Sequence, residues 1–424
     1  MTTLYDEFTW RGIVYDATEG LADVFAQEHL TAYIGFDPTA SSLHVGSLLP
    51  VIALARLQRF GHSPIAIVGG GTGMIGDPSG KSQERVLLSR DEIDMNLAGM
   101  RQQLSRFLDF DAPSNPARIV NNADWLATID LMSFLRDTGK HFTVNYLLQK
   151  ESVSRRRESE DGISYTEFSY LLLQAYDFLQ LFDRFGCTLQ MGGSDQWGNI
   201  TAGIDLIRKL RAKKAHGLVM PLVTTASGTK FGKTEAETIW LDPERTKPFK
   251  FYQFWLNTDD RDVTTYLKYL TFLGRAAIDE LERVHKAAPE KREGQRVLAR
   301  EVTGLVHGAG HAVRAEHASR VLFGEDITTL NVDDVLAVFE DVPSTELSGQ
   351  ALGAGGIGMV DLVALVGLAP SKSEARRLVQ AGGVYVNNRR VADPQTRLTR
   401  DLAIGGRLFV LRKGQKQNHL VRLT

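Results

Sequence analysis

A histidine and a glycine stand close together where a helical pattern begins, in YIGFDPTASSLHVGSLLP at residues 33–50. His44 can donate a hydrogen bond to a phosphate without carrying a fixed positive charge. Gly46 has no side chain to keep a flat ring or a sugar away from the backbone. The first turn of a helix offers unpaired N–H groups and the positive end of the helix dipole, so this pair of residues predicts an anion site.

The residues ahead of that helix are turn formers. Asp, Pro and Thr at residues 37–39 predict a turn. Ser41 or Ser42 is then expected to cap a helix that starts near Leu43. His44 and Gly46 would therefore lie in the first helical turn.

A second stretch, ASGTKFGKTEAETIW at residues 226–240, is a glycine-punctuated loop that carries Lys230 and Lys233. Such a loop is expected to be mobile and to bring two ammonium groups onto a triphosphate as charge builds on the leaving group. Two lysines alone are most often a solvated surface. The two stretches together favour nucleotide chemistry.

The elements that must position these residues follow a strand, helix, strand order. TAYIGF at 31–36 and SPIAIVGGGTG at 63–73 are apolar and rich in β-branched residues, and the helical pattern between them stops at Gly61. This order predicts a βαβ unit of a parallel sheet, in which ligands bind at the carboxyl ends of the strands. The expected fold class is α/β with a Rossmann-like parallel sheet.

A long amphipathic helix is predicted over residues 165–186, followed by a strand, a glycine turn and another helix. Tyr170, Gln174 and Asp177 are spaced by four and three residues, so they share one face of the first helix. The charged stretch 150–164 before it has no helical or strand period. It predicts a mobile surface loop.

Beyond Lys247 the pattern is helical to about residue 325, then residues 325–352 predict a linker. Residues 351–424 hold 12 Lys and Arg against 4 Asp and Glu, whereas the rest of the chain holds 37 against 47. A basic terminal module on an acidic body suggests a polyanion partner, of which nucleic acid is the usual one.

Three motifs are set aside because their context fails. GTGMIG at 71–76 is not followed by the helix of a dinucleotide-binding fold, and GDPSGKS at 76–82 is one residue short of a P-loop. His307, His311 and His317 have the spacing of a zinc protease, but the glutamate base is missing and a continuous helix would turn His317 away. They are expected to be solvated or to face RNA.

The chain of 424 residues is 43% hydrophobic and 24% charged, as expected for a globular protein of two to four domains. No stretch is long and apolar enough to span a membrane, and the start lacks a basic flank followed by an apolar segment. A cytoplasmic protein is therefore expected. The only cysteine, Cys187, predicts a buried apolar side chain, with no partner for a disulfide and no thiolate cluster for zinc.

HVGS at 44–47 and KFGKT at 230–234 occupy the places of the HIGH and KMSKS signatures of the class I aminoacyl-tRNA synthetases, which this chain resembles. The closer resemblance is to the bacterial tyrosyl-tRNA synthetases, through YIGFDPTASSLHVGS, GGGTGMIGDPSGKSQER, YLLLQAYDF and MGGSDQWGNI. SKSEARRLVQAGGVYVNN at 371–388 resembles the S4 RNA-binding fold. Two residues depart from the signatures, Ser47 at the second histidine of HIGH and Gly232 at the first serine-like position of KMSKS.

The resemblance implies that L-tyrosine and ATP, with Mg²⁺, react to tyrosyl-adenylate and pyrophosphate, and that tyrosine is then transferred to the 3′ end of tRNA(Tyr). It also implies a homodimer, no structural metal and no membrane. A tryptophan-specific class I synthetase is the nearest alternative. A synthetase-derived RNA-binding protein and a Rossmann dehydrogenase are the other hypotheses.

The same resemblance implies a domain order and a set of site residues. The implied domains are a Rossmann-like catalytic domain (1–225) with a connecting segment (about 115–165), a KMSKS-type loop (226–246), an α-helical anticodon-binding domain (247–325), a linker (326–355) and a small α+β S4-like RNA-binding domain (356–424). The implied site residues are Tyr33 and Asp177 at the phenol hydroxyl; Asp77, Tyr170 and Gln174 at the ammonium; Gly35, Asp37, Asp195 and Gln196 along the floor and the ribose; Asn122 and Trp125 at the border; Thr39, His44 and Gly46 at the phosphates and the nucleotide; Lys81, Arg85, Lys230 and Lys233 on the mobile side; and Lys372, Arg376 and Arg377 toward RNA.

Overall fold

The structure is a computed structural model, and it divides into two compact units, residues 1–245 with 258–294 and residues 246–257 with 295–424. It describes residues 2–77, 79, 89–158, 162–226, 228, 231–232, 238–322, 327, 330–340, 342–353, 355–414 and 417–424. No helix within these ranges has the length and apolar character needed to cross a membrane.

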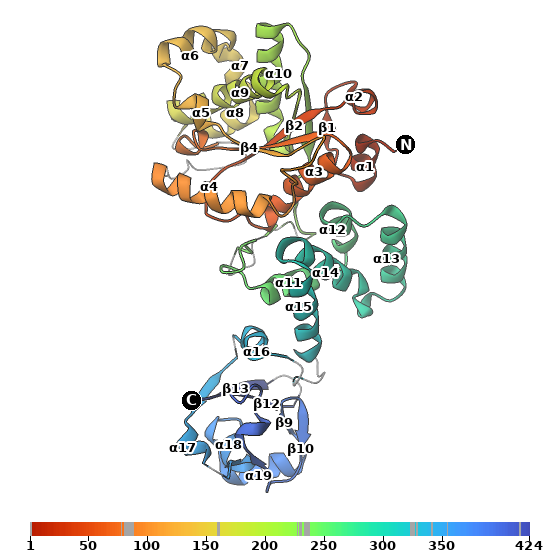
Figure 1. The fold of residues 1–424 in the computed structure, drawn as a ribbon, viewed down its shortest axis with the longest axis vertical. Coiled ribbons are helices and arrows are strands. Elements are labelled where there is room, and N and C mark those ends of the chain that lie inside the picture. Colours follow the sequence, from red (N-terminus) through yellow and green to blue (C-terminus); the bar gives the residue numbers. More distant parts are fainter. Residues whose placement is uncertain are drawn as a thin grey trace. The chain divides into compact units, whose positions relative to one another are not determined.

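A mostly parallel sheet forms the centre of the first unit (Figure 1). Its strands lie in the order β1-β6-β5-β2-β3-β4, and only the short pair β1–β6 is antiparallel. The predicted βαβ unit is confirmed, because β2 pairs in parallel with β3 and places Tyr33 beside Ile65. The strands are β1 (Asp16–Ala17), β2 (Thr31–Phe36), β3 (Ser63–Val68), β4 (Arg118–Asn121), β5 (Leu189–Gly193) and β6 (His216–Met220).

Helices cover both faces of this sheet, as an α/β fold requires (Figure 1). α3 (Leu48–Arg59) crosses between β2 and β3, and α9 (Tyr165–Phe185) packs beside α10 (Trp197–Arg211). α9 ends at Gly186, whose φ of 62° is left-handed and suits a glycine at a helix C-terminus. The remaining N-terminal helices are α1 (Leu4–Arg11), α2 (Leu21–Gln27) and α4 (Arg90–Leu104).

The connecting segment is more helical than its sequence predicts. It contains α5 (Ala123–Leu126), α6 (Leu131–Asp137), α7 (Val144–Leu148) and α8 (Glu151–Arg157). The prediction of a surface loop over 150–164 is therefore wrong at α8. A tertiary contact supports this helix, since the Arg156 guanidinium reaches the Glu167 carboxylate on α9 at 2.7 Å and both side chains are buried. An ion pair of this kind is invisible to local periodicity.

Helices continue from residue 247, as predicted, in α11 (Pro248–Leu256), α12 (Val263–Leu270), α13 (Arg275–Ala287), α14 (Glu293–His307) and α15 (Ala309–Leu322). The continuous helix expected between His311 and His317 is α15, while Gly308, with a φ of 94°, separates His307 on α14 from them. His307 is also buried rather than solvated. Its ring packs edge-on against Phe251, with 4.6 Å between the ring centroids.

The C-terminal part carries its own sheet, in the order β10-β9-β12-β13-β7. Its strands are β7 (Ser344–Leu347), β9 (Val384–Val386), β10 (Arg389–Val391), β12 (Leu408–Lys413) and β13 (Gln417–Leu423), and its helices include α16 (Val332–Val338), α17 (Gly349–Leu352), α18 (Met359–Leu365) and α19 (Lys372–Gln380). The stretch expected as a linker is thus largely structured. β7 pairs in parallel with β13, a contact between sequence-distant strands that the composition of residues 326–355 does not reveal.

Candidate active site

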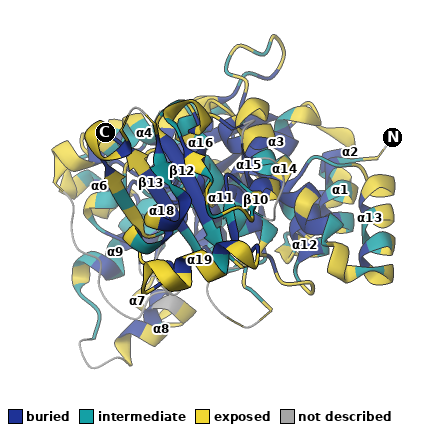
Figure 2. Ribbon diagram, turned by 90° about the horizontal axis from the view of Figure 1, so that it is seen from below, coloured by how far each residue is buried: buried dark blue, intermediate teal, exposed yellow. Residues whose placement is uncertain are grey.

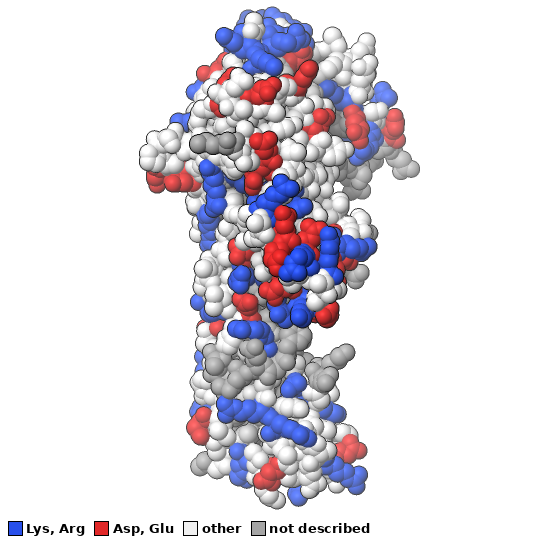
Figure 3. Space-filling model, turned by 90° about the vertical axis from the view of Figure 1, so that its right-hand side faces the viewer, with Lys and Arg blue, Asp and Glu red and all other residues white. Residues whose placement is uncertain are grey.

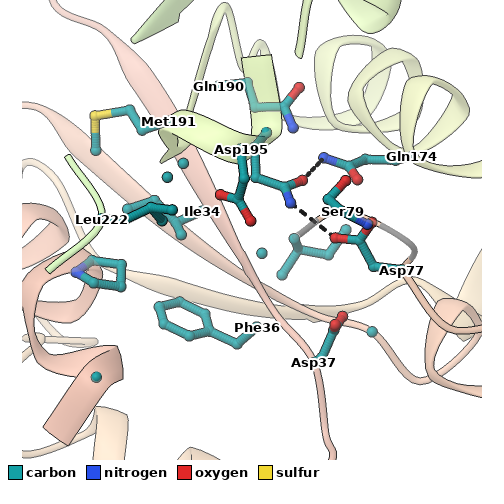
Figure 4. Close-up of a pocket in the computed structure, with 18 of the residues that line it drawn as sticks. Ile34, Phe36, Asp37, Asp77, Ser79, Gln174, Gln190, Met191, Asp195 and Leu222 are labelled. Carbon is teal, nitrogen blue, oxygen red and sulfur yellow. Dashed lines mark hydrogen bonds between the residues drawn. The ribbon is translucent and has the colours of Figure 1, made fainter. Parts of the chain in front are cut away.

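A cavity of about 610 Å³ opens at the carboxyl ends of β2 and β5, within the first unit. Figure 4 shows side chains from the sheet, from α9 and from the loop after β3 converging on it. Most of the site residues implied by the sequence line this one cavity: Tyr33, Gly35, Asp37, His44, Gly46, Asp77, Asn122, Tyr170, Gln174, Asp177, Asp195 and Gln196. The predicted shared face of α9 is confirmed, because its three polar residues all reach the cavity.

Other predicted residues do not line it. Thr39 is exposed in the turn after β2, and Trp125 lies behind Asp177 rather than in the cavity wall. Lys81, Arg85, Lys230 and Lys233 lie outside the described residues.

One end of the cavity is a buried pair, Asp177 from α9 and Tyr33 from β2. The two oxygens of Asp177 accept hydrogen bonds from Asn122 Nδ2 at 2.9 Å and from Trp125 Nε1 at 2.7 Å. Burial raises the pKa of Asp177 to about 7 in spite of these two donors, because a charge loses its hydration there.

The Tyr33 hydroxyl is buried and has no hydrogen-bond partner among the described residues. Its ring packs edge-on against Phe178, with centroids 5.3 Å apart. Burial and the nearby carboxylate of Asp177 raise the pKa of Tyr33 well above its ordinary value, so this hydroxyl keeps its proton. A buried hydroxyl without a partner is costly, so this end of the cavity suits a ligand that carries a polar atom.

Asn122 links this end to the glycine-rich loop after β3. Its Oδ1 accepts from the N–H of Gly71 at 2.7 Å, and its Nδ2 donates to Thr72 Oγ1 at 2.8 Å as well as to Asp177. Sequence reasoning missed Thr72. The signal available was GGGTG, in which Gly69 leaves room for the Thr72 side chain, since a Cβ at residue 69 would lie 2.6 Å from Thr72 Oγ1.

A connected set of amides and a carboxylate forms the second polar end (Figure 4). Gln196 Nε2 donates to Asp77 Oδ2 at 2.9 Å, and Gln174 Nε2 donates to Gln196 Oε1 at 3.2 Å. Asn199 Nδ2 lies within hydrogen-bond distance of Gln174 Oε1, at 3.0 Å, and of Ser79 Oγ, at 3.3 Å. Asn199 and Ser79 were missed from sequence. Asn199 follows Gln196 by three residues, which is the spacing of one helical face, and this signal could have found it.

The start of the α3 region is built differently from the prediction. His44 is itself the N-cap of a 3-10 turn, Val45–Ser47, and its Nδ1 accepts from the N–H of Gly46 at 3.0 Å. The prediction of a serine cap is wrong, because Ser42 Oγ instead donates to the Leu43 carbonyl and accepts from Gln103 and from the backbone of Asp242. An Nδ1 that accepts leaves the proton of the neutral ring on Nε2, where it can be donated.

The end of the loop that carries Lys230 and Lys233 (residues 226–240, the lysine loop), together with Leu241, pairs with this turn. The N–H of Val45 donates to the Ile239 carbonyl at 3.0 Å, and the N–H of Leu241 donates to the Leu43 carbonyl at 2.9 Å. Gly232 also packs here, with a φ of 84°, and a Cβ on it would lie 2.8 Å from Val45 Cγ2. The second departure from the signatures therefore has a steric cause. A side chain at residue 232 would strain the backbone and collide with the turn that holds His44.

Gly46 is required for a related reason. A Cβ at this position would lie 2.6 Å from His44 Cε1, so glycine lets the histidine ring fold back over its own turn. The His44 ring also meets the ring of Trp240 edge-on, with centroids 6.2 Å apart. Ser47, the first departure, does not line the cavity, and its N–H donates to the His44 carbonyl at 2.8 Å.

Comparison with known proteins shows which family this chain resembles. The model of the family described as tRNA synthetases class I (W and Y) matches residues 26–324, and one described as the Tyrosine--tRNA ligase SYY-like C-terminal domain matches residues 334–421. The tyrosine–tRNA ligases of Roseiflexus castenholzii and Geobacillus kaustophilus are 56% identical over 424 residues and 51% identical over 422 residues, covering 100% and 99% of each chain. The crystal structure of a C-terminally truncated mitochondrial tyrosyl-tRNA synthetase from Aspergillus nidulans superposes with a TM-score of 0.70 at 31% identity, covering 76% of this chain and 95% of that one.

Proposed function

The chain belongs to the class I tRNA synthetases of the tryptophan and tyrosine family and has the activity of a tyrosine–tRNA ligase, and from this premise we propose which of its residues perform the reaction. The tyrosine carboxylate attacks the α-phosphorus of ATP, the bond to pyrophosphate breaks, and the tyrosyl group then passes from the adenylate to the 3′ end of tRNA(Tyr). Because the substrate carboxylate is the nucleophile, the protein contributes position and charge stabilisation rather than a nucleophile of its own.

Tyr33 and Asp177 select the phenol. The observation that carries this assignment is their burial together at one end of the cavity, with the Tyr33 hydroxyl lacking a partner among the described residues. A phenol hydroxyl can donate to Asp177 while it accepts from Tyr33. The indole N–H of tryptophan can only donate, and phenylalanine can do neither, so both would leave a buried group unsatisfied.

The Asp77 end of the cavity binds the substrate ammonium. Asp77 supplies the opposite charge, and Tyr170 and Gln174 supply neutral oxygens along the same wall. The hydrogen bonds from Gln196 and from the N–H of Ser79 hold the Asp77 carboxylate in place, with lone pairs left for a further donor. Gln196 and Asn199 thus act by orienting the groups that touch the substrate.

The turn around His44 and the loops near it bind ATP. His44 Nε2–H donates to a phosphate oxygen, Gly46 and Gly35 let the nucleotide approach the backbone, and Asp195 meets the ribose. Asp37 lines this part of the cavity, and Thr39 follows it in the exposed turn after β2. Lys81, Arg85, Lys230 and Lys233 are assigned to the triphosphate by the family resemblance, and magnesium enters with ATP as part of that substrate.

The basic residues of α19 bind tRNA. Lys372, Arg376 and Arg377 are exposed on this helix, whose other side packs into the C-terminal core through Ala375 and Val379 (Figure 2). Figure 3 shows a stripe of Lys and Arg side chains over the C-terminal part of the chain. Lys372 pairs with Asp361 at 2.7 Å, so the two arginines are the stronger candidates for phosphate contacts.

Several exposed apolar side chains of the connecting segment support a homodimer. Leu131, Met132 and Leu135 on α6, Val144 on α7 and Tyr165 at the start of α9 are between 41% and 74% exposed. Large side chains gathered on one segment in this way are typical of an interface. Leu131→Glu with Met132→Glu should therefore give a monomer in sedimentation, whereas Met95→Glu, an equally exposed methionine on α4, should not.

The assignment to tyrosine is tested by ATP–pyrophosphate exchange in the presence of each amino acid. Tyrosine should stimulate exchange and tryptophan should not, while exchange with tryptophan alone would overturn the tyrosine assignment. Exchange with neither would favour an RNA-binding protein without catalysis. Because the reaction supplies translation, we place it in the cytoplasm.

The tRNA surface has a separate test. Arg376→Glu with Arg377→Glu should raise the KM for tRNA and lower the salt dependence of binding, by a slope of about 1 to 2, without changing exchange. Arg283→Glu, a charge reversal on the exposed face of α13, is the matched control. Unchanged charging in the double variant would remove α19 from the tRNA surface.

A further inference from the structure

Helix α12 makes three contacts with described residues just before and within the lysine loop. The Tyr266 hydroxyl donates to the Thr224 carbonyl at 3.1 Å, and the Tyr266 ring lies against the ring of Phe231, with centroids 4.9 Å apart. Asp262 Oδ2 accepts from the N–H of Ala226 at 2.9 Å. Asp262 stands at the N-cap of α12, yet its side chain caps no N–H of its own helix and is directed to the loop instead.

The residues held in this way belong to the cavity wall. Thr224 and Phe231 both line the cavity, and Phe231 is buried although it lies on a loop. Its carbonyl oxygen lies 3.8 Å from the position of a Cβ on Gly46, and the next residue, Gly232, packs against Val45. Phe231 is also the direct neighbour of Lys230 in the chain.

The opposite end of α12 is fixed to the helix that starts at the ATP site. Arg56, near the end of α3, donates to the carbonyls of Tyr269 and Lys268 at 2.9 and 3.0 Å. Arg11 donates to the Lys268 and Leu273 carbonyls, each at 2.7 Å. Charged donors on the carbonyls of a helix C-terminus satisfy groups that the helix leaves unpaired and complement its dipole. α12 is therefore a rigid support.

We propose that Tyr266 and Asp262 are positioning residues for amino-acid activation. They hold residues 224–226 and 231–232 close to the turn that contains His44. Lys230 and Lys233, which are attached to these residues in the chain, depend on that placement to reach ATP. The proposal rests on the assignment of this loop to the triphosphate. Neither residue touches a substrate. Both act through the loop, so their effect belongs to the transition state of activation and not to tyrosine binding.

Single-turnover adenylate formation and equilibrium binding of tyrosine test this proposal with three variants. Tyr266→Phe removes one hydrogen bond and keeps the ring, so the rate should fall by about three- to tenfold. Tyr266→Leu also loses the contact with Phe231 and should lose more. Tyr269→Phe is the matched control, because Tyr269 lies on the same helix and its hydroxyl donates to a backbone carbonyl, that of Gly12, away from the loop.

A structural role alone would lower thermal stability and tyrosine affinity together, whereas a positioning role leaves tyrosine affinity within twofold of wild type. The decisive measurement combines Tyr266→Phe with a background that lacks both loop lysines, Lys230→Ala with Lys233→Ala. If Tyr266 acts through the loop lysines, it should cost less than twofold in that background, because the interaction it supports is already gone. Full additivity, or a Tyr266→Phe rate equal to that of Tyr269→Phe, would overturn the proposal.

A missing role for Tyr266 and a missing activity would give different results. A wild-type chain with tyrosine-dependent exchange and a silent Tyr266→Phe would remove only the role of Tyr266. A wild-type chain without exchange would overturn the loop assignment, and this inference with it.

Discussion

The phenol end and the phosphate end of the cavity are built by different means. Asp177 and Tyr33 are side chains buried in the core, fixed by Asn122, Trp125 and Phe178 before any ligand arrives. The phosphate end is formed by backbone turns, with His44 folded over Gly46 and Gly232 packed against Val45. Selection of the amino acid therefore depends on unsatisfied buried groups, while its activation depends on where loops lie.

This difference predicts two distinct kinds of variant. Changes at the phenol end should alter which amino acid binds and how binding depends on pH. Changes at the phosphate end should alter the rate of adenylate formation and leave tyrosine affinity unchanged.

The largest expected effect is that of Lys233→Ala. If the Lys233 ammonium meets charge that develops on the departing pyrophosphate, adenylate formation should slow by on the order of 10²- to 10³-fold with unchanged tyrosine affinity. Stopped-flow kinetics and equilibrium dialysis measure the two quantities, with Lys213→Ala, an exposed lysine after α10, as the control. A parallel loss of tyrosine affinity would erase the contrast between the two ends.

Gly232→Ala tests whether the phosphate end depends on backbone geometry. A left-handed alanine costs about 1–2 kcal/mol, and its Cβ would also meet Val45 at 2.8 Å. We expect adenylate formation to fall by about 10- to 30-fold, which corresponds to roughly 1.4–2 kcal/mol.

Gly228→Ala is the matched control for that variant. Gly228 also has a left-handed φ, of 78°, but nothing lies within 4 Å of its Cβ position. It should therefore show the backbone cost without the collision. Equal rates for the two alanine variants would mean that the contact between Gly232 and Val45 is irrelevant to activation.

The sequence could predict which elements form this site better than it could predict the hydrogen bonds and ion pairs between them. The spacing of Tyr170, Gln174 and Asp177 was enough to place them on one helical face, and the strand, helix, strand pattern located the cavity. The bond from Gln196 to Asp77 joins residues 119 positions apart, so no local pattern contains it. The buried ion pair that ties α8 to α9 is likewise absent from any helical or strand period.

The cap at His44 shows a second limit. Propensity favours serine at a helix start, but Ser42 is recruited by Gln103 and Asp242, which come from other parts of the chain. Because Ser42 is held by these tertiary hydrogen bonds, the residue that caps the turn is His44. Of the implied lysines and arginine on the mobile side, all lie outside the described residues and stay predictions.

Tyr33→Phe tests whether the Tyr33 hydroxyl contributes to the selection of tyrosine at the phenol end. The variant removes one donor to the substrate hydroxyl, so the preference for tyrosine over phenylalanine should fall by about five- to tenfold. The measure is the ratio of kcat/KM values for exchange with each amino acid. Tyr176→Phe, on the same helix as Asp177 but outside the cavity, is the control. An unchanged ratio would show that the Tyr33 hydroxyl does not meet the substrate.

The smallest expected effect is a pH dependence of tyrosine affinity. Because burial raises the pKa of Asp177 to about 7, its carboxyl is largely protonated at pH 6.5 and ionised at pH 8. A phenol that donates to the carboxylate favours the ionised form, so affinity should fall about fourfold between pH 8 and pH 6.5. Fluorescence titration measures this dependence.

The contribution of Asp177 to folding stability should depend on pH with the opposite sign. The pKa of Asp177 is higher in the folded chain than in the unfolded chain, so its full contribution to stability is present below pH 4 and is lost as the pH rises toward 7.

Asp177→Asn removes the titration and should make tyrosine affinity weaker but independent of pH between 6.5 and 8. A wild-type affinity that does not change with pH, or that rises at low pH, would show that Asp177 does not accept a hydrogen bond from the phenol hydroxyl. The distinction between a selecting end and an activating end would then rest on Tyr33 alone.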